Sequence, residues 1–115
     1  MIKIYHNSRC SKSRQGVALL EESGVDFEII KYLEKVPSKE ELTTIIAQLN
    51  ISPIDLVRKN EAIWKEQFKG KELSDAEIIE AMLSNPKLIE RPIIIRGNKA
   101  VIGRPLENIT SLLKR

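Results

Sequence analysis

The chain opens with a predicted strand, helix and second strand, and this order constrains the fold more than any other feature. Ile2–Tyr5 is short, β-branched and aromatic, which is typical of a strand. A helical pattern begins at about Ser11 and is expected to end at Gly24, because glycine readily adopts the left-handed geometry of a helix end. Asp26–Tyr32 has the pattern of a second strand. A strand–helix–strand unit favours parallel pairing with a right-handed crossover.

The middle of the chain, from about residue 38 to residue 90, predicts helices. Ser38 and Ser74 are each followed three residues later by a glutamate, which is the spacing of a capping box at a helix start. An amphipathic stripe follows the first of them, at Leu42, Ile45, Ile46 and Leu49. Pro53 is expected to open another short helix that runs to Arg58. Asn85-Pro86 is expected to end the helix that Ser74 begins.

The last part of the chain predicts a β-hairpin and a final helix. Pro92–Arg96 contains three consecutive isoleucines and predicts a buried strand, Gly97-Asn98 a tight turn, and Ala100–Ile102 the returning strand. Pro105 is expected to open the last helix. The complete order is therefore β-α-β, several helices, then β-β-α. It predicts an α/β, thioredoxin-like fold in a single domain, residues 1–115, with a helical insertion at about 38–90 between the second and third strands.

Composition and charge narrow the class of protein. With 115 residues, 42% hydrophobic and 30% charged, the chain has the composition of one soluble globular domain. The net charge of +3 is mild, and basic and acidic residues alternate along the chain. We therefore expect neither nucleic acid nor a membrane as a partner. No apolar run approaches the roughly 18 residues of a membrane span, and a monomer is the default expectation.

The chain has a single cysteine, Cys10. One cysteine cannot form an internal disulfide, which indicates a reducing compartment and predicts a cytoplasmic protein. Any redox cycle must therefore take its second sulfur from another molecule. One cysteine and one histidine are also too few ligands for a metal site, so no metal is expected.

Cys10 lies between the first predicted strand and the first predicted helix. The first amides of a helix have no internal partners, and together with the helix dipole they favour a negative charge. A cysteine at this position can have its pKa lowered from about 8.5 to between roughly 3.5 and 7.5. The alternative is an inert, buried thiol. The polar and basic neighbours of Cys10 disfavour burial and favour a catalytic thiolate.

The residues around Cys10 can support a thiolate. Arg14, with Arg9 and Lys12, adds positive charge, and the side chains of Ser13 and His6 could donate hydrogen bonds to the sulfur. His6 could instead satisfy backbone groups of the loop. The same helix end is also a ready-made site for an oxyanion.

Three arginines lie at predicted element boundaries: Arg58, Arg91 and Arg104. The planar guanidinium group suits oxyanions, so each is a candidate for oxyanion binding. The alternative for each is a solvated surface charge. Arg91 and Arg104 both precede a proline, and we hypothesise that the Arg91–Pro92 peptide bond is cis.

The segment His6-Asn7-Ser8-Arg9-Cys10-Ser11-Lys12-Ser13-Arg14 resembles the signature of the glutaredoxin-coupled arsenate reductase (ArsC) family, in the thioredoxin-like superfamily. The resemblance spans nearly the whole chain. It continues in order through Tyr32-Leu33-Glu34, Ile51-Ser52, Leu56-Val57-Arg58-Lys59-Asn60, Glu90-Arg91-Pro92-Ile93 and Gly103-Arg104-Pro105.

This resemblance implies an activity and a site. Cys10 would match the family's nucleophile, which attacks arsenate to give a thioester-like adduct. Glutathione would then attack as a co-substrate, glutaredoxin would supply a further reduction, and arsenite would leave, with no bound cofactor. The oxyanion would be held by Arg58, Arg91 and Arg104. His6 and Ser13 would match residues that help to hold the thiolate.

Two alternative functions stay open at the level of sequence. The first is a glutathione-dependent thiol reductase that acts on another substrate. The second is a regulator of the Spx type, which has the same fold and binds RNA polymerase. Many such regulators carry a Cys-x-x-Cys switch. Here Ser13 stands at the second position, which disfavours this reading.

Overall fold

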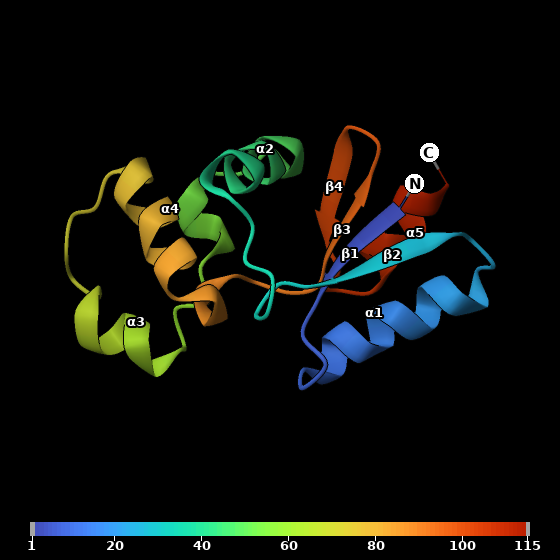
Figure 1. Cartoon of the computed structure of the whole chain (residues 1–115), viewed down its shortest axis with the longest axis horizontal. Helices are drawn as coiled ribbons and strands as arrows, with labels where there is room; N and C mark the ends of the chain where they lie inside the picture. The colour runs from blue at the N-terminus through green and yellow to red at the C-terminus, as the bar shows by residue number, and fades with distance from the viewer. Residues whose placement is uncertain (1, 115) are drawn as a thin grey trace. The chain divides into compact units, whose positions relative to one another are not determined.

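The computed structural model describes residues 2–114, which fold into two compact units (Figure 1). The sheet unit joins the described residues up to Lys35 to those from Arg91 onward. The helical unit is the continuous segment Val36–Glu90. The sheet unit is therefore built from both ends of the chain.

The sheet unit contains a four-stranded sheet with the order β2-β1-β3-β4. Its strands are β1 (Ile2–His6), β2 (Phe27–Lys31), β3 (Ile93–Arg96) and β4 (Lys99–Ile102). β1 runs parallel to β2 and antiparallel to β3, and β3 forms a hairpin with β4. Gly97 in the hairpin turn has a φ of +62°, a left-handed conformation that glycine adopts without strain. The predicted parallel pairing, the hairpin and the thioredoxin-like fold class are confirmed.

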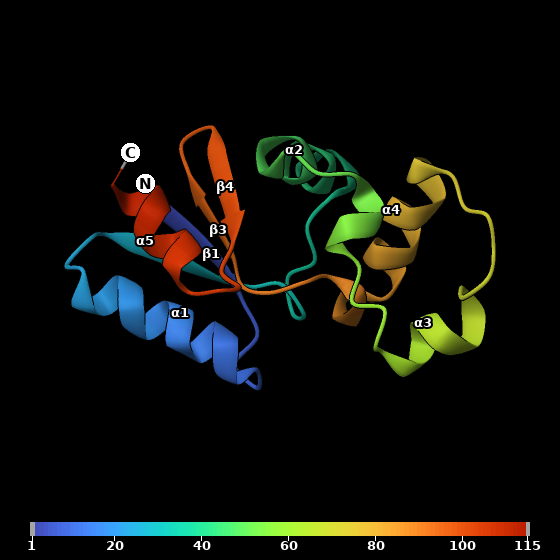
Figure 2. The same ribbon diagram turned by 180° about the vertical axis from the view of Figure 1, so that it is seen from behind.

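Two helices supply the apolar side chains that complete the core of the sheet unit: α1 (Ser11–Glu22) and α5 (Glu107–Leu113) (Figure 2). Side chains two apart on a strand share a face of the sheet, so Ile2 and Ile4 point the same way. The core cluster consists of Ile2, Ile4, Leu20, Ile94, Ile109 and Leu112. Because Leu20 belongs to α1 and Ile109 to α5, both helices pack against this one face.

Pro92 is the point at which three segments of the sheet unit meet. A Cβ atom added to Gly103 would lie 2.8 Å from Pro92 Cγ, and one added to Gly16 would lie 3.2 Å from the same atom. The backbone also meets here, since Gly103 N donates to Pro92 O at 2.8 Å. Helix α1, the entry to β3 and the loop before α5 are thus held in close contact around one proline ring.

In the helical unit, one helix (α4) packs against another helix (α2) and against two short 3-10 turns (η1 and η2). Its elements are α2 (Lys39–Leu49), η1 (Pro53–Leu56), α3 (Ala62–Gln67), α4 (Asp75–Ser84) and η2 (Pro86–Leu88). Both predicted capping boxes are confirmed, because Ser38 Oγ accepts from the Glu41 amide at 3.1 Å and Ser74 Oγ from the Glu77 amide at 3.2 Å. Leu42, Leu56 and Met82 are fully buried in this unit.

Two expectations about elements are wrong, and one helix was missed. The helix expected from Pro53 to Arg58 is a single 3-10 turn that ends at Leu56. It ends there because Val57 forms an antiparallel bridge with Ile89. Helix α3 was not predicted, and α5 begins two residues later than expected, at Glu107. Pro105 lies in a turn before that helix, where its carbonyl accepts from the Asn108 amide at 3.1 Å.

Two peptide bonds that precede prolines are cis, Arg91–Pro92 and Arg104–Pro105. The first of them confirms the hypothesis made from the sequence. Within residues 2–114, no helix is both long and apolar enough to cross a membrane.

Candidate active site

Cys10 is the N-cap residue of α1 and follows a tight turn after β1. Its backbone is extended, with φ −96° and ψ 122°, so the helix begins immediately after it. The turn is closed by the Cys10 amide, which donates to Asn7 O at 3.0 Å, and by the Arg9 amide, which donates to Asn7 Oδ1 at 3.0 Å. The predicted location of Cys10 at a helix N-terminus is confirmed, and the residue is half-buried.

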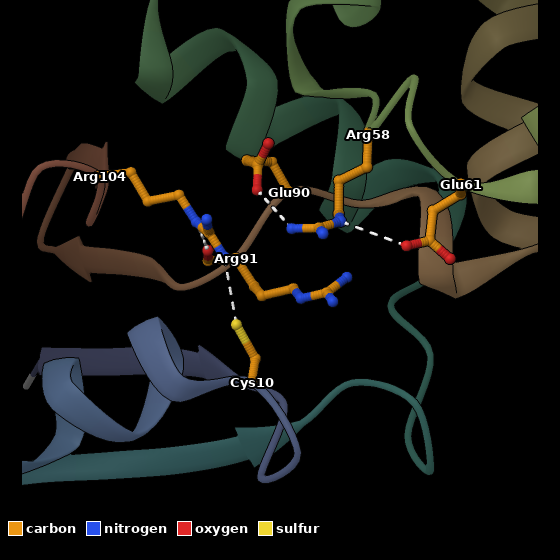
Figure 3. Close-up of polar contacts among 6 residues, drawn as sticks. All are labelled: Cys10, Arg58, Glu61, Glu90, Arg91 and Arg104. Carbon is orange, nitrogen blue, oxygen red and sulfur yellow. Dashed lines mark hydrogen bonds and ion pairs between the residues drawn. The ribbon is translucent and has the colours of Figure 1, made fainter.

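Arg104 contacts the sulfur directly (Figure 3). Its Nη2 atom donates to Cys10 Sγ at 3.1 Å, and its Nε atom donates to Arg91 O at 2.7 Å. One guanidinium group therefore joins the thiol of the first loop to the backbone that leads into β3. Two of the three predicted oxyanion-binding arginines, Arg91 and Arg104, thus belong to the same constellation as Cys10.

The surroundings of Cys10 favour its thiolate form. Partial burial alone would raise the pKa of the Cys10 thiol, but other groups outweigh burial and lower this pKa below its ordinary value. These groups are the backbone amide of Ser13, the hydrogen bond and charge of Arg91, and the charge of Arg104. Cys10 is therefore a thiol in an electropositive environment, of the kind in which reactive cysteines are found.

His6 and Ser13 form a buried pair beside the turn. His6 Nδ1 lies 2.7 Å from Ser13 Oγ, and the same hydroxyl accepts from the Asn7 amide at 3.0 Å. The Ser13 hydroxyl is therefore used to hold the turn, while its backbone amide faces the sulfur. Burial and the charge of Lys31 lower the pKa of His6, against an opposing hydrogen bond from Ser13. Thiolate support by the side chains of His6 and Ser13 stays a prediction.

Arg14 is bound to the same turn. Its Nη1 atom donates to Ser8 O at 2.9 Å. This contact links the second turn of α1 to the loop that precedes Cys10. Its predicted support of the thiolate stays a prediction.

Arg58 belongs to the helical unit, where it pairs with two carboxylates (Figure 3). Its Nη1 atom lies 3.1 Å from Glu90 Oε1, and its Nε atom lies 3.6 Å from Glu61 Oε2. The β-bridge between Val57 and Ile89 places Arg58 close to Glu90. The Arg58 amide extends this pairing, since it donates to Leu88 O at 2.7 Å. Arg58 is thus held by ion pairs, and oxyanion binding by Arg58 stays a prediction.

Sequence reasoning missed two asparagines that shape the site. Asn7 accepts and donates the hydrogen bonds that close the turn before Cys10. Asn108 donates to Arg104 O at 3.3 Å and to Ile102 O at 2.9 Å. A signal was present in each case, since asparagine is typical of turns and of helix starts. Among residues 2–114, no group of three or more His, Cys, Asp or Glu residues is placed to hold a metal ion.

The chain was compared with the sequence models of known protein families. The model of the ArsC family matches residues 5–112, which include Cys10, all three candidate arginines and both asparagines. The chain belongs to the ArsC family. This ArsC chain is similar over almost its full length to relatives named arsenate reductase and to relatives named as uncharacterised.

Three relatives illustrate that similarity. The uncharacterised protein YfgD of Escherichia coli is 42% identical over 97% of this chain and 96% of its own length. A protein named arsenate reductase from Neisseria meningitidis serogroup A is 41% identical, with 97% of each chain covered. The solved structure of an arsenate reductase from Vibrio cholerae is 44% identical, covers 96% of this ArsC chain and 95% of its own, and superposes with a TM-score of 0.91.

Proposed function

We propose that this chain is an arsenate reductase in which the Cys10 thiolate is the nucleophile. The observation that carries the proposal is the 3.1 Å contact from Arg104 Nη2 to the Cys10 sulfur, in a site that lowers the pKa of that thiol. The name arsenate reductase, borne by the relative from Neisseria meningitidis and by the structure from Vibrio cholerae, supports the choice of substrate.

The first step forms a sulfur–arsenic bond. The Cys10 sulfur attacks arsenic, one arsenic–oxygen bond breaks, and the departing oxygen leaves as water after it takes up protons. Arg91 and Arg104 balance the negative charge of the oxyanion, because guanidinium groups form charge-assisted hydrogen bonds to such oxygens. Arsenic remains in its +5 state in this adduct.

The two electrons that convert arsenate into arsenite come from external thiols. The chain has only one cysteine, so it cannot form an internal disulfide. The glutathione sulfur bonds to the arsenic of the adduct, and a second oxygen leaves as water, so arsenic is still in its +5 state. A glutaredoxin thiol then attacks the glutathione sulfur, and the arsenic–sulfur bond to glutathione breaks with its electron pair left on arsenic. The disulfide formed between them accounts for the two electrons that arsenic gains. Water then releases arsenite and returns Cys10 to its thiolate form.

Arg58 remains a predicted oxyanion ligand within this proposal. An Arg58→Ala variant would raise the KM for arsenate if Arg58 binds the substrate. An unchanged KM would assign Arg58 to the ion pairs with Glu61 and Glu90 alone. The cytoplasmic location and the monomeric state expected from the sequence belong to the same proposal.

The test is arsenite release by the purified protein with arsenate, glutathione and glutaredoxin. The wild type should release arsenite and the Cys10→Ser variant should not. Wild-type release no higher than that of the variant contradicts arsenate reduction. Release that continues at the same rate without glutathione or without glutaredoxin contradicts only the choice of reductants, so the two parts of the proposal fail separately.

A further inference from the structure

The loop that carries Arg104 is held by a side chain from α5. Asn108 Nδ2 donates to Ile102 O at 2.9 Å and to Arg104 O at 3.3 Å. Ile102 is the last residue of β4, and Asn108 is the second residue of α5. The amide group therefore spans the short connection between these two elements and binds the carbonyls on both sides of Gly103.

These bonds serve the loop and not the helix. An asparagine that caps a helix accepts hydrogen bonds from the free amides of the first turn through its oxygen. Asn108 instead uses its nitrogen, and its two N–H groups match two carbonyl acceptors. This side chain is half-buried, so its hydrogen bonds contribute to stability. A buried carbonyl that is left without a donor costs free energy.

The position of the Arg104 guanidinium group depends on this loop. Its Nε atom is bound to Arg91 O and its Nη2 atom to the Cys10 sulfur. The guanidinium group can make both contacts together only if the backbone of Arg104 is held in position. The loop is fixed on one side by the Gly103 amide, which donates to Pro92 O at 2.8 Å, and at the Arg104 carbonyl by Asn108.

We propose that Asn108 is a positioning residue that holds the Arg104 loop so that the guanidinium group reaches the Cys10 sulfur. The inference deepens the proposed function, because it concerns the same thiolate. It does not depend on the substrate.

The experiment titrates the Cys10 thiolate by its ultraviolet absorbance, without arsenate. Cys10 is the only cysteine, so the signal comes from one sulfur. The Asn108→Ala variant should raise the pKa of Cys10 by about half a pH unit, which is a roughly threefold loss of thiolate below that pKa. The Arg104→Ala variant should raise it further, because the whole charge is removed.

A double-mutant comparison separates positioning from general loosening of the fold. If Asn108 acts through Arg104, the Asn108→Ala change should no longer shift the pKa of Cys10 in the Arg104→Ala background. Asn85→Ala is the matched control. Asn85 is half-buried, and its Nδ2 donates to Ala81 O at 3.1 Å in the helical unit. Loss of this bond should leave the pKa of Cys10 unchanged.

The outcomes decide the inference independently of the proposed function. An unchanged pKa in folded Asn108→Ala, or an equal shift with and without Arg104, would overturn it. Should Asn108→Ala fail to fold, Asn108→Ser keeps one donor and should give a smaller rise in the pKa, with the same two overturning results. A protein that shows the expected shifts but releases no arsenite would retain the positioning role and lose the proposed function.

Discussion

Cys10 takes its electrostatic partners from both ends of the chain. Ser13 is close in sequence, but Arg104 is 94 positions away. The local partners could be predicted because a helix start is visible in the sequence. The contact with Arg104 could not, because it depends on how β3, β4 and the following loop return to the first turn. Sequence patterns therefore located the cysteine at a helix start and picked out the three arginines as candidates, but they could not show which arginine contacts the sulfur.

The alkylation rate of Cys10 should follow the lowered pKa. Only the thiolate reacts, so the rate with iodoacetamide rises with pH and levels off above the pKa of the thiol. We expect it to level off at a lower pH in the wild type than in free cysteine. In Arg104→Ala the profile should move to higher pH, and coincident profiles for the two proteins would contradict a role for Arg104.

Arg91→Ala should weaken oxyanion binding. The variant loses a hydrogen bond between charged groups, which is worth about 1.5 to 3 kcal/mol. Calorimetric titration of arsenate into the Cys10→Ser protein, with and without the Arg91→Ala change, measures binding in the absence of chemistry. Equal affinities would remove Arg91 from the proposed anion site.

The stability of the fold should fall on acidification through the range in which histidine titrates. The pKa of His6 is lowered in the folded protein, mainly by burial. Below the ordinary value of about 6.5, the unfolded chain therefore binds a proton that the folded chain does not. The contribution of His6 is complete above that value and is lost as the pH falls toward the folded pKa. Urea unfolding from pH 7.5 downward should show this slope in the wild type and a shallower one in His6→Gln.

At the scale of elements, the contact around Pro92 leaves little space for a larger residue. Gly103→Ala would place a Cβ atom 2.8 Å from Pro92 Cγ and 3.0 Å from Ile109 Cδ1. We expect a loss of about 1 to 3 kcal/mol in the free energy of unfolding, as is usual for an overpacked core. Gly16→Ala is the informative comparison. Its contact of 3.2 Å is looser, and alanine in α1 gains about 0.5 to 1 kcal/mol of helix propensity. A Gly103→Ala variant as stable as Gly16→Ala would contradict this account.

Elements that begin with a local signal were predictable, and those decided by tertiary contacts were not. Ser38 and Ser74 each form a capping box with the glutamate three positions later, so both partners of the box can be recognised in the sequence. The turn at Pro53 also begins with a local signal but stops early, because Val57 pairs with Ile89, far along the chain. Helix α3 is only six residues long and carries no capping hydrogen bond from its N-cap side chain, which explains why it was missed.

At the scale of the whole molecule, the fold could be predicted from the order of the strands and helices, whereas individual long-range contacts could not. A strand–helix–strand opening and a hairpin before a last helix are enough to predict that β1 and β2 are parallel and that β3 and β4 are paired. The pairing of β1 with β3, which completes the order β2-β1-β3-β4, is seen only in the structure. The ion pair between Arg58 and Glu90, which are 32 positions apart, could not be predicted from any sequence pattern. Oppositely charged residues are common, and only the folded backbone selects which of them meet.

The meeting of Gly16, Pro92 and Gly103 has a consequence for how the protein responds to heat. Each functional segment of the sheet unit is attached to this contact: Cys10 caps the helix of Gly16, Arg91 precedes Pro92, and Arg104 follows Gly103. We therefore expect that a thermal fluctuation displaces these segments only when it also opens the packed centre. Thiol labelling at fixed pH should therefore keep its native rate on warming and change only across the melting of the sheet. A change in the labelling rate several degrees below that melting temperature would mean that the segment around Cys10 unfolds before the sheet does.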